Sequence, residues 1–313
     1  MEILLVDNGS TDGSVSEAAS AFPGVRVLRS NLNLGYAGGC NFGLEQAKGE
    51  YALLFNDDAV ATRGMLESLV EAARGDSRVA ACQPKILSIR NLGQFDYAGA
   101  AGGEMDRFGF PFCRGRIFDT VETDKGQYDS HSEIFWASGA CCLLRMSALK
   151  AVGFLDADFF AHMEEIDLQW RLMNRGYKVV SVPDAIARHD AGSTLAPDQP
   201  LKVYLNHRNS LVMLLKNHQT GVLVTVLPFR ILFDLAAAIY RLARLEPLNM
   251  LAVFRAYLYL VFHLPEVLRK RASPGNGMGG ATPFYSGSIV WDYFVMGRKK
   301  FSDLPGRSGT SNG

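Results

Sequence analysis

Residues 1–190 alternate short apolar runs with helical segments, and this alternation constrains the fold more than any other feature of the chain. The pattern is typical of a parallel α/β sheet. Strands are expected at 3–6, 25–29, 51–55 and 178–182, and helices at 14–22, 41–48, 62–74 and 159–175. Ligands of such sheets bind beyond the carboxyl ends of the strands, so we expect chemistry near Asp7 and Asp58, which follow two of them.

Length and charge exclude some classes of protein. The 313 residues allow one large domain or one domain with an appendage, and the second arrangement is favoured. With 32 basic and 32 acidic residues the formal charge is zero, so no global attraction to nucleic acid is expected. No signal peptide is expected at the N-terminus. The cysteines lack CxxC spacing and indicate buried thiols in a reducing compartment; they are Cys40, Cys82, Cys113, Cys141 and Cys142.

Two regions lack a clear α/β pattern. Residues 85–135 are rich in glycine and aromatic residues, which indicates loops and short strands bordering a binding cleft. Residues 221–264 are strongly apolar, but charged residues interrupt them before the ~18 uncharged residues of a secure membrane span. With basic runs at 269–271 and 298–300, the pattern predicts helices lying in a membrane interface. A helical pair packed on the preceding domain is the alternative, and a disordered tail is expected at 304–313.

Two acidic clusters are candidates for chemistry. Asp57 and Asp58 follow the strand expected at 51–55, and adjacent carboxylates there suit a divalent cation such as Mg²⁺ or Mn²⁺, with a loop-capping Asp pair as an equal alternative. Glu164, Glu165 and Asp167 follow an apolar segment and supply a candidate general base. Acids in the first turn of a helix also favour the helix dipole, which is the alternative interpretation.

Seven motifs in order and spacing resemble glycosyltransferase family 2, most closely its rhamnosyltransferase-like branch. They lie at 6–14, 33–41, 55–58, 138–140, 153–156, 164–171 and 188–189. The resemblance implies a GT-A (Rossmann-like) nucleotide-diphospho-sugar transferase domain over 1–220. The apolar and basic region at 221–303 is then a C-terminal amphipathic helical region.

The resemblance also implies a donor pocket. By its motifs, Asp7 contacts the nucleotide base, with Asn8 beside it. Asn33, Gly35 and Asn41 fall in the segment that lines the nucleotide pocket, where glycine permits close approach of the backbone.

The same resemblance assigns the metal and the base. Asp58 occupies the place of the metal ligand, Asp57 shares the task, and His189 approaches the metal or the diphosphate; a lone His without that resemblance would more often be structural. Glu165 takes the position of the catalytic base, where the family has Asp. Glu164 is an alternative, as is the Asp167 named above.

The implied activity is inverting sugar transfer from a nucleotide-diphosphate donor to a hydroxyl of a glycan or lipid-linked acceptor. The expected location is the cytoplasm, peripheral to the inner face of the cell membrane, and no nucleic-acid partner is expected. A sugar nucleotidyltransferase is disfavoured because residues 7–10 lack its basic Gly-rich loop, and residues 35–39 lack the GxGxxG register of a dinucleotide oxidoreductase. The family also begins with one more apolar strand, so a start site upstream, or an impaired membrane-associated relative, is expected.

Overall fold

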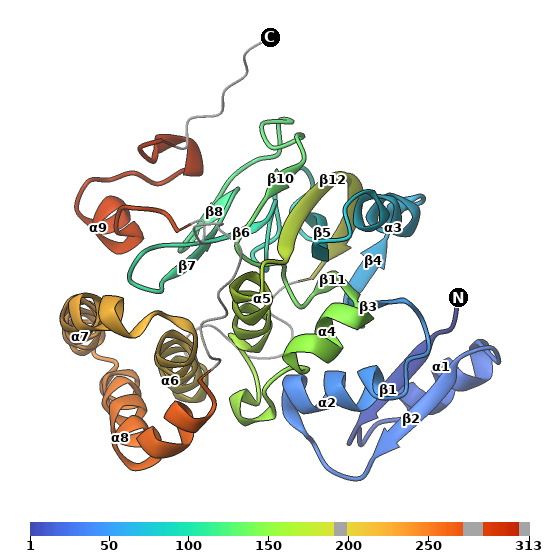
Figure 1. The fold of residues 1–313 in the computed structure, drawn as a ribbon, viewed down its shortest axis with the longest axis horizontal. Helices are drawn as coiled ribbons and strands as arrows, with labels where there is room; N and C mark the ends of the chain where they lie inside the picture. Colours follow the sequence, from blue (N-terminus) through green and yellow to red (C-terminus); the bar gives the residue numbers. More distant parts are fainter. Residues whose placement is uncertain (191–198, 272–283, 307–313) are drawn as a thin grey trace.

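The computed structural model describes residues 1–190, 199–271 and 284–306. Helices and strands alternate through the first half, as predicted, and long helices follow (Figure 1). The first elements are β1 (Leu4–Asn8), α1 (Ser14–Ala21), β2 (Arg26–Ser30), α2 (Gly35–Leu44), β3 (Tyr51–Phe55), β4 (Ala59–Ala61), α3 (Met65–Gly75) and β5 (Val79–Ser88). Short strands follow at β6 (Gly103–Met105), β7 (Pro111–Cys113), β8 (Arg116–Ile117), β9 (Thr120–Val121) and β10 (Ser132–Glu133).

The second half carries the acidic segment and the long helices. Its elements are β11 (Cys141–Arg145), α4 (Met146–Val152), the 3₁₀ helix η1 (Ala157–Phe159), α5 (Glu164–Asn174), β12 (Lys178–His189), α6 (Pro200–Asn217), α7 (Thr220–Ala243), α8 (Pro247–Arg269), α9 (Ile289–Phe294) and the 3₁₀ helix η2 (Phe301–Asp303). The predicted helix at 159–175 therefore begins five residues later, because residues 160–163 form a loop. The predicted strand at 178–182 continues to His189, and the helix expected at 41–48 already begins at Gly35.

The main sheet is mixed rather than parallel, which corrects the prediction from sequence. Its strand order is β10-β12-β5-β11-β3, with β4 paired to β12. β12 runs parallel to β5, whereas β11 is antiparallel to both β5 and β3. The long excursion between β5 and β11 brings the chain back in the opposite direction, and no crossover helix then forces parallel pairing.

β1 forms a separate two-stranded parallel sheet with β2. Within the described residues β1 therefore has a neighbour on one edge only. β3 is likewise the last strand of its sheet. Such edges expose unpaired backbone groups. The additional strand expected from the family resemblance stays a prediction.

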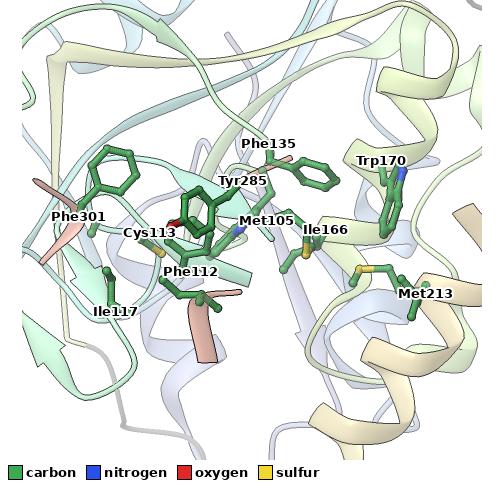
Figure 2. Packing of buried hydrophobic residues seen from close by; sticks show 14 of the residues in the cluster. Met105, Phe112, Cys113, Ile117, Phe135, Ile166, Trp170, Met213, Tyr285 and Phe301 are labelled. Carbon is green, nitrogen blue, oxygen red and sulfur yellow. The ribbon is translucent and has the colours of Figure 1, made fainter. Parts of the chain in front are cut away.

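Residues 85–135, the Gly- and aromatic-rich region, form short strands as expected and also contribute much of the largest hydrophobic core. That they border a binding cleft stays a prediction. β6–β9 make a four-stranded antiparallel sheet. Phe112 is 1% exposed and packs with Phe301 and Tyr285 of the C-terminal segment, and Figure 2 shows this cluster continuing to Trp170 of α5. The part of the predicted disordered tail that is described, 304–306, includes the buried Leu304; 307–313 lie outside the described residues.

α6, α7 and α8 gather on the opposite side of the molecule from β1, β2 and α1 (Figure 1). α7 and α8 are long and apolar enough to cross a membrane by length and composition, with mean hydropathies of 2.1 and 1.4 in their best windows. The prediction from sequence had treated the charged residues of 221–264 as interruptions of a secure span. In α7, Arg230 and Asp234 bond to each other on the inner face, at 1% exposure each, so they do not interrupt the apolar outer face.

Candidate active site

The carboxyl end of β1 is tied to the loop before α2 through the amide of Asn8. Its Nδ2 donates to the Gly35 carbonyl at 2.9 Å, and its Oδ1 accepts from the Leu34 N–H at 2.9 Å. Asn33 Oδ1 accepts the Gly35 N–H at 2.9 Å, while Asp7 accepts the Ser10 N–H on the next turn. Four of the five residues predicted for the donor pocket therefore lie at one edge.

Gly35 is required by a close approach of two backbones. It has φ +71°, and a Cβ there would lie 2.4 Å from the carbonyl oxygen of Phe160. The Ala37 N–H donates to that same oxygen at 3.2 Å. Only glycine fits this conformation and this contact without strain, so the start of α2 rests directly on the loop that precedes α5.

Asn41, the fifth predicted donor-pocket residue, is used differently. Its Nδ2 donates to the Leu155 carbonyl at 2.7 Å, and its Oδ1 accepts the Leu155 N–H at 3.0 Å. Both ends of the amide therefore hold α2 to the 153–156 motif. Asn41 affects the pocket through the backbone it fixes.

The loop before α5 is strained. Phe160, His162 and Met163 all have positive φ, at 63°, 70° and 73°. Side chains of α6 hold this backbone: Asn209 Nδ2 lies 2.9, 2.8 and 2.7 Å from the carbonyls of residues 159, 161 and 162, and Arg208 Nη2 donates to those of residues 158 and 159. Non-glycine residues with such dihedrals persist where the surroundings over-determine them, often at functional sites.

Glu164 and Glu165 open α5 directly after this loop. Glu164 is 3% exposed, and in both residues Oε2 is buried with no hydrogen-bond partner among the residues described. Burial raises the pKa of Glu165 to about 7, although backbone amides of the first turn offset part of the effect. Burial, and then the neighbouring Glu165, raise the pKa of Glu164 well above its usual value. The pair therefore combines one carboxyl poised near neutrality with one that keeps its proton.

Asp167 does not share this environment. It is fully buried, and its carboxylate accepts from Arg171 Nε at 3.0 Å, Lys216 Nζ at 3.0 Å and Asn217 Nδ2 at 2.8 Å. Each oxygen is thus occupied by a donor of α5 or α6. This corrects the prediction that Asp167 is an alternative base, because its role is to hold the two helices together.

Asp58, from the other acidic cluster, contacts His189. β4 pairs antiparallel with β12, so that Ala59 lies opposite His189. This register brings Asp58 Oδ1 to 2.9 Å from His189 Nε2. On the other side of the ring, His189 Nδ1 lies 2.9 Å from Asp96 Oδ1. Burial lowers the pKa of the imidazole, but the bonds and charges of the two carboxylates outweigh it and raise that pKa overall.

The donor set of this cluster is compatible with Mn²⁺ or Mg²⁺. A carboxylate oxygen and an imidazole nitrogen face each other, and the Asp58 side chain is 22% exposed. Among the described residues no group of three or more His, Cys, Asp or Glu side chains could hold a metal. Such cations are commonly bound by one or two protein ligands plus substrate phosphates, so a diphosphate would have to complete the coordination. The exposed Asp57 is adjacent.

The segment 137–140 lies between the Asp58–His189 cluster and helix α5, which begins with Glu164 and Glu165. The Asn56 N–H donates to the Ala140 carbonyl at 3.1 Å, and the Tyr36 hydroxyl donates to the Gly139 carbonyl at 2.6 Å. Gln169 of α5 donates to the Ala137 carbonyl at 2.7 Å. Burial, and then the charges of Cys40, Glu164 and Glu165, raise the pKa of Tyr36 well above its usual value.

Four residues that support the candidate site through hydrogen bonds were not predicted from the sequence. These are Asp96, Tyr36, Gln169 and Asn209. Tyr36 and Gln169 lie inside the motifs at 33–41 and 164–171, but the sequence assigns neither of them a role. Asp96 and Asn209 lie in no motif, directly after no strand and in no acidic run. The partners of these four residues are 32 to 103 residues away along the chain.

The solved structure of GalNAc-T7 with UDP, GalNAc and Mn²⁺ has a similar fold, with a TM-score of 0.51. The match covers 68% of this chain and 41% of that one at 14% identity, and it shows the fold alone. The domain thus has the GT-A fold, as the sequence predicted.

Residues 1–153 match the family model described as glycosyl transferase family 2. The N-acetylglucosaminyl-diphospho-decaprenol L-rhamnosyltransferase of Mycobacterium tuberculosis is 30% identical over 236 residues, which span 70% of this chain and 76% of the relative. The galactofuranosyltransferase GlfT1 of the same species is 26% identical, over 66% of this chain and 70% of the relative. The chain belongs to glycosyltransferase family 2, and it is a nucleotide-sugar-dependent glycosyltransferase.

Proposed function

We propose that this glycosyltransferase inverts the anomeric carbon of a nucleotide-diphosphate sugar, with Glu165 as the base and a divalent cation at Asp58 and His189. One observation carries the proposal: a buried carboxyl with a pKa near 7 and an oxygen without a partner follows a strained loop. An efficient general base has a pKa near the working pH. Glu164 keeps its proton and takes no part in the transfer.

On the leaving-group side, Asp58 and His189 would hold Mg²⁺ or Mn²⁺, with the exposed Asp57 beside them. When bound, the cation supplies positive charge that stabilises the departing nucleoside diphosphate. Asp7, Asn8 and the Asn33–Gly35 loop would bind the nucleotide. The support is that Asp7, Asn8, Asn33 and Gly35 lie together at the carboxyl end of β1.

On the acceptor side, Glu165 accepts the hydroxyl proton as the acceptor oxygen bonds to the anomeric carbon. The bond from that carbon to the diphosphate oxygen breaks on the opposite face, and the electron pair leaves with the nucleoside diphosphate. The displacement is direct, so configuration inverts and no covalent enzyme intermediate forms. The proton on Glu165 is then released to solvent.

We propose a lipid-linked acceptor and peripheral attachment to the cytoplasmic face of a membrane. α7 is fixed to the rest of the protein through Asp234, which accepts from Tyr257 of α8 at 2.7 Å and lies 3.2 Å from His207 of α6. Its outer face is apolar, with Leu232 61% and Ile239 67% exposed. A helix docked on one side and apolar on the other suits an interface better than a span. The rhamnosyltransferase relative is named for a diphospho-decaprenol acceptor.

Turnover tests the proposal. Purified protein with Mn²⁺ and a panel of nucleotide-diphosphate sugars, rhamnosyl donors included, should release nucleoside diphosphate when a prenyl-diphosphate sugar is added. The Glu165→Gln variant should lose turnover but keep donor affinity, while the adjacent Glu164→Gln variant should keep both. NMR of the product reports the anomeric configuration. Retention of configuration, or full turnover by Glu165→Gln, would exclude this mechanism.

Donor binding without turnover would instead favour the alternative of an impaired family member. The observation behind that alternative is the single paired edge of β1 among the described residues. The comparison is a chain extended by one apolar N-terminal strand. If the extended chain turns over and the original chain does not, the loss of turnover is explained by the two-stranded sheet of β1 and β2.

A further inference from the structure

We infer that Asp96 is a positioning residue that fixes the imidazole of His189 for the metal site. The inference rests on the proposed metal at Asp58 and His189. The imidazole lies between the two carboxylates, with 2.9 Å from Asp96 Oδ1 to His189 Nδ1 and 2.9 Å from His189 Nε2 to Asp58 Oδ1. Each of the two nitrogens of the ring therefore contacts a different carboxylate.

Burial distinguishes the roles of the two carboxylates. The Asp96 side chain is 3% exposed, whereas that of Asp58 is 22% exposed. A cation that arrives with a diphosphate donor comes from solvent, so it can reach Asp58 and cannot reach Asp96. Asp58 is therefore the ligand and Asp96 the anchor behind the ring.

The fold holds Asp96 rigidly at this position. Its backbone N–H donates to the Ile86 carbonyl at 2.9 Å, and its Oδ1 also accepts the Ala98 N–H at 2.8 Å. Phe95 bridges Leu87 of β5, and the next residue of β5, Ser88, pairs with His189 of β12. Adjacent positions on one strand thus set the carboxylate and the ring side by side.

This anchor selects which nitrogen is available. With Nδ1–H donating to Asp96, Nε2 is the nitrogen directed at Asp58, whose side chain is 22% exposed. A ring without the anchor could rotate or adopt the other tautomer, and both changes remove the Nε2 lone pair from the metal position. Carboxylates behind a metal-binding histidine typically contribute about 10- to 100-fold to metal affinity.

The alternative is a purely structural role, in which the Asp96–His189 hydrogen bond only holds the segment after β5 against β12. A double-mutant cycle separates the two roles, because a positioning residue acts only through the side chain it positions. The readout is the binding of Mn²⁺ in the presence of inorganic pyrophosphate, followed by the EPR signal of free Mn²⁺. No turnover is needed, so the measurement is independent of donor and acceptor.

We expect Asp96→Ala to weaken Mn²⁺ binding about 100-fold and Asp96→Asn, which retains an acceptor oxygen, about 10-fold. In a His189→Ala background, Asp96→Ala should have no further effect. The control is Asp292→Asn, which alters another buried carboxylate, bonded to Tyr285 and Arg298, and should leave Mn²⁺ affinity unchanged. The Asn variant keeps the test decisive where the Ala variant fails to fold.

Unchanged Mn²⁺ affinity in the folded Asp96 variants would overturn the inference. So would an equal loss in the presence and absence of His189, which indicates a general structural effect. Failure of the metal site itself gives a different result: His189→Ala then binds Mn²⁺ and pyrophosphate like the wild type, and both the proposed metal site and this inference fall.

Discussion

Replacing Glu165 by Gln should stabilise the protein at alkaline pH while it removes the proposed base. Burial raises the pKa of this carboxyl to about 7, from an ordinary 4.5. Since one pKa unit corresponds to about 1.4 kcal/mol, ionising Glu165 costs about 3 kcal/mol more in the folded protein than in the unfolded chain. Gln has a similar shape and no charge, so the variant avoids that cost.

The direction of the pH dependence follows from the order of the two pKa values. Between about 4.5 and 7 the folded protein retains a proton that the unfolded chain has lost. The contribution of Glu165 to stability is therefore fully present below about pH 4.5 and is lost as pH rises through 7. Relative to the wild type, the free energy of unfolding of Glu165→Gln should increase by about 3 kcal/mol from pH 4.5 to pH 8.

Urea unfolding followed by tryptophan fluorescence, at pH 4.5, 6 and 8, measures this difference. Asp156→Asn is the control of opposite sign. Burial opposes ionisation of Asp156, but Lys216 and Lys270 hold its pKa at about 2, so this variant should lose stability at pH 8. If the stability of Glu165→Gln relative to the wild type is constant across the three pH values, the carboxyl is not buried without compensation and the argument for the base fails.

Five further outcomes are expected. The wild-type kcat/KM should rise with pH around a midpoint of about 7, and Glu165→Gln should lower kcat by about 10²- to 10⁴-fold. Gly35→Ala should destabilise the protein by about 1–3 kcal/mol in thermal unfolding, because its Cβ would contact a carbonyl oxygen at 2.4 Å at positive φ. Asn209→Ala should lower kcat more than donor affinity, since it frees the strained loop. Replacing Leu232 and Ile239 by Ser should reduce co-sedimentation with anionic vesicles and leave turnover of a soluble acceptor unchanged.

Several features of the site could be predicted from the sequence because they depend on local order. Apolar runs followed by polar residues located Asp7 and Asp58 at strand ends. The acidic run and the apolar residues before it located Glu164 and Glu165. The interruption of residues 221–264 by charges could not be interpreted in this way, because the sequence does not reveal that Arg230 and Asp234 pair on the buried face of α7.

The tertiary structure decided which of the predicted acids remain available for chemistry. Asp167 and Glu165 are two residues apart, yet Asp167 bonds to Lys216 and Asn217, while Glu165 keeps one oxygen without a hydrogen-bond partner among the described residues. His189 was readable as a candidate, but its anchor Asp96 lies 93 residues away. The sequence by itself determined the order of the motifs, the family and the set of candidate acidic and histidine residues. Burial and pairing assign a role to each carboxylate, and they arise only when segments far apart in the chain pack together.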